Sequence, residues 1–560
     1  MKFRSHINLS GLDNGLARSL YKSMGYSEDE LTDRPVIGIA NSWSTLVPGH
    51  YNLNELASFV TKGIYRGGGT AVEFGVISAC DGIANGHEGM KYILPSREVI
   101  CNSVEIQAQA HRLDGLVLLA SCDKILPGML MAAARLNIPA IVVTGGVMQG
   151  GEVFDGRTTD ATSNDEAIGM YRIGKISQEQ LKRIEDVSCP GCGSCSFLGT
   201  ANTMGCVTET LGMSLPGSAL VPAVWADRRR IAYESGRKIC ELISEQITAR
   251  DIISNAAINN AIRVVQAISG STNAVLHLSA ISYEAELDID VMDSFDKTYA
   301  TTPILAKVNP AAAFNMEDFH RAGGIPKVMK NLGSLIDDTA MTCTGRTVQE
   351  NLNSYDHPFK DDRKIVRGME DAYSKTGGIA VLKGSLAPDT AITKPGAFSK
   401  ELHYFKGTAK VYNSEELANQ AILNGEIKPG NVVVIRYEGP KGGPGMREMY
   451  KAMKFLYGQE LALTTALVTD GRFSGTNNGC FVGHVSPEAA EGGPIALVED
   501  GDWIEIDVVK GTLNLIVDEE EMKIRKELWQ KPDIAVPRGY LRNYAKLASS
   551  ANRGAVILND

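Results

Sequence analysis

The chain has 560 residues, of which 44% are hydrophobic and 22% charged, and its formal net charge is −10 at pH 7. This composition is typical of a globular protein, and the length is too great for one hydrophobic core, so we expect two or three domains. The acidic balance gives no electrostatic reason to expect nucleic acid or an anionic membrane as a partner.

No apolar run approaches the roughly 18 residues that a membrane-spanning helix needs. Residues 1–11 carry basic side chains but no apolar segment follows them, unlike a secretory signal, so we expect a cytoplasmic protein. Ten cysteines are few for this length, and a disulfide scaffold is not expected. Four of them crowd between Cys189 and Cys206, which is typical of metal or redox sites.

Apolar segments alternate with a helical pattern in the first half of the chain. Residues 36–40, 116–120 and 138–143 have the short, continuously apolar character of buried strands, and residues 129–137 resemble a helix. The strand–helix–strand order predicts a parallel α/β sheet.

From about residue 377 the pattern changes to short strands separated by glycine-rich turns. We expect these strands at residues 379–382, 409–412, 432–435, 466–468, 503–508 and 512–517, the last two forming a hairpin. The pattern predicts a β-rich second domain with a boundary near residues 360–380. We therefore divide the chain into domains of residues 1–370 and 371–560.

Cys122, Asp123 and Lys124 directly follow the strand expected at residues 116–120. The carboxyl end of a parallel strand is where α/β proteins bind ligands. A thiolate suits iron or zinc and a carboxylate suits magnesium, so the adjacent pair can hold two different metals. A capped helix start with a buried free cysteine is an equally open alternative.

Cys192 and Cys195 have the two-residue spacing that brings two sulfurs to one metal centre. Outside the run from Cys189 to Cys195, no further Cys-x-x-Cys and no nearby histidine pair completes a four-ligand zinc site. A thiol redox pair and inert structural thiols remain alternatives.

Two further segments contain candidate residues. Asp81-Gly82 ends an apolar run and can supply another carboxylate, although such a pair is most often a turn. Ser474 follows a strand through a tight turn, where backbone N–H groups and a neighbouring cation can stabilise a serine alkoxide. The alternative is an ordinary serine in a strand-to-turn connection.

With these residues the sequence resembles the dihydroxy-acid dehydratase and aldonate dehydratase family over nearly the whole chain. The motifs that carry the resemblance occur in family order at residues 81–90, 95–98, 122–129, 200–204, 270–274, 442–446 and 470–475. It implies a three-layer α/β/α N-terminal domain with a parallel sheet and a swivelling β-barrel-like C-terminal domain. It also implies a homodimer or homotetramer.

The resemblance assigns roles residue by residue. It makes Cys122 and Cys195 ligands of an iron–sulfur cluster and Ser474 the catalytic base. Its magnesium ligands are Asp81, Asp123, Glu448 and Lys124, the lysine as a carbamate. Magnesium then stabilises the enolate formed when the base removes the C2 proton, and an open iron acts as Lewis acid on the 3-hydroxyl.

The chain departs from the family at Gly49, where many members have a cysteine. It has Cys192 instead, so we expect Cys122, Cys192 and Cys195 to hold a cluster, with Cys189 as the alternative to Cys192. Three protein ligands leave one iron of a cubane open, which favours [4Fe–4S] over [2Fe–2S].

The substrate is expected to be a small dihydroxy acid. The resemblance favours dehydration of 2,3-dihydroxy-3-methylbutanoate to 3-methyl-2-oxobutanoate, in valine and isoleucine biosynthesis. Arg447 replaces the usual proline before Glu448, and residues 474–479 lack a common arginine. A sugar-acid dehydratase with the same mechanism is therefore an alternative, and a thiol redox or zinc-binding protein is a more distant one.

Overall fold

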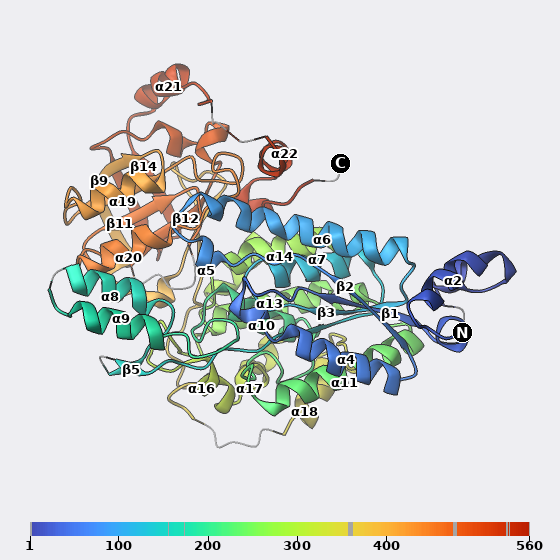
Figure 1. The fold of residues 1–560 in the computed structure, drawn as a ribbon. Coiled ribbons are helices and arrows are strands. Elements are labelled where there is room, and N and C mark those ends of the chain that lie inside the picture. Colours follow the sequence, from blue (N-terminus) through green and yellow to red (C-terminus); the bar gives the residue numbers. More distant parts are fainter. Residues whose placement is uncertain are drawn as a thin grey trace.

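A four-stranded parallel sheet lies at the centre of the N-terminal part of the computed structural model (Figure 1). Its strand order is β2 (Thr70–Gly75), β1 (Val36–Asn41), β3 (Gly115–Leu119) and β4 (Ala140–Val143). Every residue of β1, β3 and β4 is buried, as expected for parallel strands covered on both faces. The structure describes residues 3–154, 156–172, 174–356, 362–473, 479–533, 536 and 538–558.

Helices cover both faces of this sheet and make the predicted three layers. Helices α4 (Leu53–Arg66) and α11 (Ala226–Glu245) lie on one face, and α6 (Ile93–Ala110) and α7 (Ile125–Leu136) on the other (Figure 1). The α4–α11 pair is held close by glycines. A Cβ at Gly63 would lie 2.0 Å from the Tyr233 carbonyl oxygen, and one at Gly236 would lie 2.2 Å from that of Val60.

Further helices of the N-terminal part extend the helical layers. They are α1 (His6–Leu9), α2 (Gly15–Ser23), α3 (Glu28–Thr32), α5 (Asp81–Ala84), α8 (Ser163–Arg172), α9 (Gln178–Val187), α10 (Thr200–Thr210), α12 (Ala249–Ile252), α13 (Asn255–Ala267), α14 (Asn273–Glu284), α15 (Val291–Tyr299), α16 (Met316–Arg321), α17 (Gly324–Leu332) and α18 (Val348–Ser354). Strands β5 (Val153–Phe154) and β6 (Arg157–Thr158) pair as a two-stranded antiparallel ribbon. All of α10 is buried, so it is a core helix.

The C-terminal part is built on an eight-stranded mixed sheet. In sheet order its strands are β14 (Thr512–Ile516), β13 (Trp503–Asp507), β9 (Tyr404–Tyr412), β10 (Asn431–Ile435), β11 (Ala466–Thr469), β12 (Cys480–Ser486), β8 (Thr390–Thr393) and β7 (Ala380–Leu382). The two ends of this order nearly meet, because the Leu513 N–H donates to the Lys383 carbonyl oxygen over 3.0 Å. The expected barrel-like sheet is confirmed.

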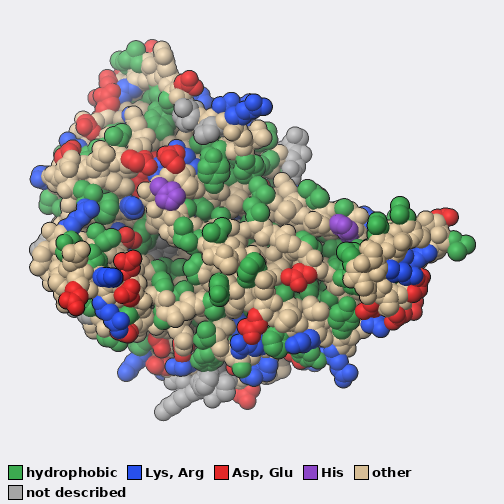
Figure 2. Space-filling model, viewed as in Figure 1, with side chains coloured by type: hydrophobic (Ala, Val, Ile, Leu, Met, Phe, Trp, Pro, Cys, Tyr) green, Lys and Arg blue, Asp and Glu red, His purple; other side chains and the backbone are tan. Residues whose placement is uncertain are grey.

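Four helices belong to this C-terminal part: α19 (Glu415–Leu423), α20 (Tyr450–Gly458), α21 (Glu519–Leu528) and α22 (Tyr540–Leu547). Helix α20 packs against α8 of the N-terminal part, where Lys454 forms a 3.1 Å ion pair with Glu166 (Figure 1). Lys and Arg side chains alternate with Asp and Glu over the face shown in Figure 2, which is hollowed near the position of α5. Among the described residues, no helix is both long and apolar enough to cross a membrane.

The strands predicted from apolar runs are confirmed, and the helix predicted at residues 129–137 begins earlier. Helix α7 starts at Ile125 and includes Pro127 and Gly128 in its first turn. Proline is tolerated there because its missing N–H has no partner within the first turn of a helix. The helix therefore begins directly after Lys124, which places the Cys122–Lys124 motif at the strand-to-helix corner.

Candidate active site

Buried His50 fixes the corner that carries Cys122 and Asp123. Its Nε2 accepts hydrogen bonds from the backbone N–H groups of Ser121 and Cys122, over 3.2 and 3.1 Å. Its Nδ1 lies 2.8 Å from the Ser42 carbonyl oxygen and so carries the proton. Burial lowers the pKa of His50 to about 4, which keeps the ring neutral and suited to accept at Nε2. Sequence reasoning missed this residue.

This corner opens onto a cavity of about 290 Å³ beside β2, β3 and the start of α5. The cavity combines two kinds of metal-binding side chain. Four thiols line it, from Cys80, Cys122, Cys189 and Cys195. Four carboxyl side chains also line it, from Asp81, Asp123, Asp165 and Glu448, and the group formed by Asp81, Asp123 and Glu448 is compact. Cys192 is not in the lining, so the structure brings together two of the three cysteines predicted to hold a cluster.

The three carboxylates form one compact group, with an oxygen of each lying within 4.8 Å of the others. Burial and the nearby Asp123 raise the pKa of Asp81 well above its usual range. Burial also acts to raise the pKa of Asp123, but Lys124 and a hydrogen bond from Asp81 outweigh it, and that pKa is lowered. Carboxylates this close repel one another when all are ionised, and a bound divalent cation offsets that repulsion. The group therefore fits Mg²⁺.

Lys124 is fully buried, and its Nζ donates to Asp123 Oδ2 over 2.8 Å. Two buried histidines interact electrostatically with it: burial and the nearby cations lower the pKa of His277, and lower that of His484 to about 3. Within the described part of the chain, His277 Nε2 and both ring nitrogens of His484 have no hydrogen-bond partner. Unpaired donors beside a buried lysine fit an added anionic group such as a carbamate on Lys124.

Glu448 reaches the cavity from the C-terminal part and is held by two side chains. Arg472 forms a buried ion pair with it, and Asn273 Nδ2 donates to Glu448 Oε2 over 3.3 Å. Arg472 Nε also donates to the Met446 carbonyl oxygen over 2.8 Å, which ties the two loops together. The chain then continues through Phe473, whose carbonyl oxygen accepts from Thr272 Oγ1 over 3.1 Å. Ser474 comes next and lies outside the described residues.

The Cys195 loop is anchored to its neighbours by backbone hydrogen bonds. Gly193 N–H donates to the Pro48 carbonyl oxygen over 3.1 Å, and Ser194 N–H donates to that of Gly146 over 2.9 Å. Gly193 has a φ of +131° and passes so close to Met148 that a Cβ would lie 2.5 Å from its nitrogen. Such a position favours glycine.

Gly49 lies against the thiols on the other side. A Cβ built at Gly49 would lie 2.6 Å from Cys122 Sγ. The loop of residue 49, the Cys122 corner and the Cys195 loop therefore meet at one point, as the resemblance implies. Burial raises the pKa of both Cys122 and Cys195 well above the usual thiol range, so a metal is needed to hold them as thiolates. The donor set fits an iron–sulfur cluster.

Apolar side chains contribute most of the remaining surface of the wall, and polar residues lie among them. Ile83, Met90, Met148 and Phe197 are among the apolar residues. The polar residues include Asp165 and Tyr450, which are hydrogen-bonded to each other. Sequence reasoning missed both, since neither stands in a recognisable motif.

Arg447 does not line the cavity, although it precedes Glu448. Its guanidinium is buried among carboxylates, 2.6 Å from Glu416, 3.3 Å from Glu415 and 3.5 Å from Glu438. The exchange of the usual proline for Arg447 therefore adds no charge to the cavity wall.

Two family models match the chain. The dihydroxy-acid/6-phosphogluconate dehydratase N-terminal model matches residues 34–351, and the C-terminal model of the same family matches residues 364–555.

Curated relatives are similar over the whole length. A dihydroxy-acid dehydratase of Acetivibrio thermocellus is 48% identical over 558 residues, covering 99% of this chain and 100% of the relative. One of Pyrococcus furiosus is 50% identical over 556 residues, with 99% and 100% covered. One of Methanococcus aeolicus is 48% identical over 547 residues, with 98% of each chain covered.

Proposed function

The chain belongs to the dihydroxy-acid/6-phosphogluconate dehydratase family, and we propose that it dehydrates 2,3-dihydroxy carboxylic acids to 2-oxo acids. The proposed reaction converts 2,3-dihydroxy-3-methylbutanoate to 3-methyl-2-oxobutanoate, a step in valine and isoleucine biosynthesis in the cytoplasm. The observation that carries the proposal is the single cavity in which buried carboxylates lie beside thiols and an apolar wall. One small molecule can then meet a hard metal, a soft metal and apolar side chains.

Two cofactors are part of the proposal. Asp81, Asp123, Glu448 and carbamylated Lys124 hold Mg²⁺, and Cys122 and Cys195 hold an iron–sulfur cluster, with [4Fe–4S] favoured over [2Fe–2S]. When bound, these groups supply Lewis acidity at the substrate carboxylate and 2-hydroxyl and at the 3-hydroxyl. The sequence predicts Cys192 as a third sulfur ligand, but Cys192 does not line the cavity.

The side chains of the chain supply orientation and proton transfer. Arg472 and Asn273 hold Glu448 in place, and His50 holds the Cys122–Asp123 corner. Ser474, assigned by the family resemblance, takes the C2 proton on its Oγ as the bond from C3 to the hydroxyl oxygen breaks. Ser474, which starts as the alkoxide, would return that proton to the departing hydroxide, so that water leaves and the base is restored, and the enol tautomerises to the 2-oxo acid without net oxidation or reduction.

The apolar wall favours a branched-chain acid over a sugar acid. Methyl groups of the substrate would lie against Ile83, Met90 and Phe197. Each additional sugar hydroxyl left unpaired against such a wall costs about 1–3 kcal/mol. Arg447, which raised the sugar-acid alternative, is occupied by Glu415, Glu416 and Glu438 outside the cavity. The thiol redox and zinc alternatives needed Cys192 and Cys195 at one centre, and only Cys195 lines the cavity.

An anaerobic assay of 2-oxo-acid formation tests the proposal. Protein purified under argon, with Mg²⁺, is given 2,3-dihydroxy-3-methylbutanoate and separately a panel of aldonates. We expect the branched-chain acid to have the highest kcat/KM. A higher value with an aldonate overturns the substrate, and colourless zinc-loaded protein without turnover overturns the dehydratase mechanism. Size-exclusion chromatography with light scattering tests the proposed homodimer or homotetramer.

A further inference from the structure

We propose that Cys80 is the third protein ligand of the iron–sulfur cluster, in place of the cysteine that this chain lacks at position 49. The inference rests on the proposed function, because it needs a cluster to be present. It assigns a role to a residue that precedes the carboxylate Asp81 and that our sequence analysis passed over. It also moves the third ligand away from Cys192.

The dipeptide Cys-Asp occurs after two strands of the parallel sheet. Cys80-Asp81 follows β2 and Cys122-Asp123 follows β3, and β2 and β3 flank β1 in the parallel sheet. Parallel strands end at the same edge, so both dipeptides arrive on the same side of the sheet. All four side chains line the same cavity. Each dipeptide therefore delivers one soft and one hard ligand to a site that needs both.

The surroundings of the Cys80 thiol are suited to a cluster ligand. The sulfur lies over the start of α5, where a Cβ at Gly82 would be 3.7 Å from Cys80 Sγ. The thiol lines the same cavity as that of Cys122 and interacts with it electrostatically. Cys195 interacts with both. Three thiols from three separate loops thus lie around one volume.

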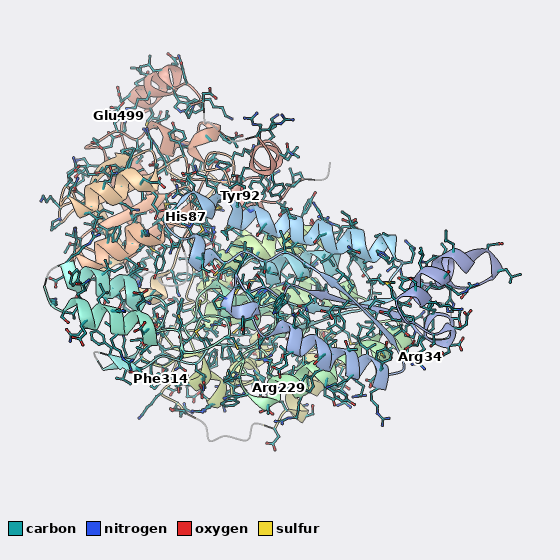
Figure 3. All side chains as sticks on the ribbon, in the orientation of Figure 1. Arg34, His87, Tyr92, Arg229, Phe314 and Glu499 are labelled. Atoms are coloured by element: carbon teal, nitrogen blue, oxygen red, sulfur yellow. The ribbon has the colours of Figure 1, made fainter. Side chains whose placement is uncertain are left out.

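The position of Cys192 also favours Cys80 as the third ligand. It is absent from the cavity wall, and its thiol interacts with Glu55 on α4 and Arg229 on α11. Arg229 lies on α11, below His87 in the view of Figure 3. Gly193, at a φ of +131°, lies between Cys192 and Cys195, and of these two cysteines only Cys195 lines the cavity. Cys189 lines the cavity but is exposed.

Single substitutions separate these assignments. Cys80→Ser, Cys189→Ser and Cys192→Ser are purified anaerobically beside the unaltered chain, and iron and sulfide per chain, visible absorbance and the electron paramagnetic resonance of the reduced protein are measured. We expect Cys80→Ser to lose most of its iron and sulfide or to change its resonance signal. We expect the other two to match the unaltered chain. A full cluster with an unchanged signal in Cys80→Ser, or its loss in Cys192→Ser, overturns the assignment.

A second measurement needs no variant and so avoids any effect on folding. The native chain, with and without its cluster, is treated with iodoacetamide, and alkylation at each cysteine is read by peptide mass spectrometry. We expect Cys80 to be protected only when the cluster is present and Cys192 to react equally in both forms. Equal reaction of Cys80 in both forms overturns the assignment. An unaltered chain that takes up no iron and sulfide on reconstitution instead overturns the proposed cofactor, and the ligand assignment with it.

Discussion

His50 shows how one residue prepares the site without contacting substrate. It is buried and neutral, and it accepts two backbone N–H groups at the turn that presents Cys122 and Asp123. Substitution by alanine leaves both donors buried without a partner. We expect His50→Ala to lower the free energy of unfolding by about 2 kcal/mol or more. Urea unfolding followed by circular dichroism measures this.

Exposed His111 provides the control for that change. Its Nδ1 contacts only the Gln107 carbonyl oxygen one turn earlier on α6. We expect His111→Ala to unfold at a urea concentration within experimental error of the unaltered chain. If His50→Ala lowers the free energy of unfolding no more than His111→Ala does, water replaces the imidazole as the acceptor at the corner.

At the residue scale, the sequence predicted which motifs carry chemistry better than where each side chain lies. Cys122, Asp123, Asp81 and Glu448 all reach one cavity, as expected. The Cys-x-x-Cys spacing predicts that Cys192 and Cys195 share a centre, and of the two only Cys195 lines the cavity. Gly193 between them has a φ of +131°, a conformation that glycine adopts at little cost and that the spacing alone does not predict.

At the scale of elements, the close contact of α4 and α11 depends on small residues. A methyl group at Gly63 would lie 2.0 Å from the Tyr233 backbone oxygen, which has no room to move within α11. We expect Gly63→Ala to lower the free energy of unfolding by about 1–3 kcal/mol, because the helices must separate. Thermal unfolding measured by calorimetry tests this.

Gly15 on α2 is the matched control, since a Cβ there meets no atom within 4 Å. Alanine at Gly15 is expected to leave stability unchanged or to raise it by about 0.5–1 kcal/mol, through the lower entropy of the unfolded chain. If both alanine variants behave alike, the close approach of α4 and α11 does not limit stability.

The acidic group around Arg447 gives a second test at this scale. Burial raises the pKa of Glu415 to about 7 and that of Glu438 to about 8, and Arg447 opposes both shifts. Arg447→Leu leaves these carboxylates buried without their cation, and we expect a loss of about 3–5 kcal/mol. Glu416→Gln, at the half-exposed partner, is expected to cost less than about 1 kcal/mol.

The Arg447→Leu variant also tests which residues determine the choice of substrate. Arg447 lies outside the cavity wall, so the ratio of kcat/KM between 2,3-dihydroxy-3-methylbutanoate and any aldonate is expected to stay the same in Arg447→Leu. A ratio that shifts tenfold or more toward the aldonate would mean that this side chain selects the substrate.

Elements with continuous apolar runs were predictable, and those without were not. Residues 116–120 and 432–435 are confirmed as β3 and β10 because burial on both faces leaves an unmistakable run. Strand β2 alternates half-buried and exposed residues after Ala71, so its sequence does not distinguish it from a loop. Helix α10 is buried all round and shows no apolar stripe from which to predict it.

At the scale of the whole molecule, the carboxylate group exists only because two distant parts of the chain meet. Asp81 and Asp123 come from the N-terminal part and Glu448 from the C-terminal part. The contact is close: a Cβ at Gly445 would lie 2.0 Å from the Lys91 carbonyl oxygen, in the segment beside His87 and Tyr92 (Figure 3). No local pattern in the sequence specifies this meeting, and here the family resemblance supplied it.

Magnesium bound at this group joins the two parts and should stabilise the whole chain. We expect Mg²⁺ to raise the melting temperature of the cluster-loaded protein, since it binds the folded state and not the unfolded one. Glu448→Gln is expected to abolish most of that increase. Glu505→Gln, in β13 and away from the cavity, should keep it.

The size of the magnesium effect should depend on pH in a direction that Asp81 fixes. Folding raises the pKa of Asp81, so the metal-free folded chain holds a proton that the unfolded chain releases. That proton contributes stability at low pH, which is lost as pH rises through the raised pKa. Mg²⁺ competes with this proton for Asp81. Its binding therefore stabilises the folded chain most at pH values at which Asp81 has lost the proton. The increase in melting temperature on adding Mg²⁺ should therefore grow as the pH rises through the raised pKa of Asp81, and an increase that shrinks as the pH rises would show that Asp81 does not bind the ion.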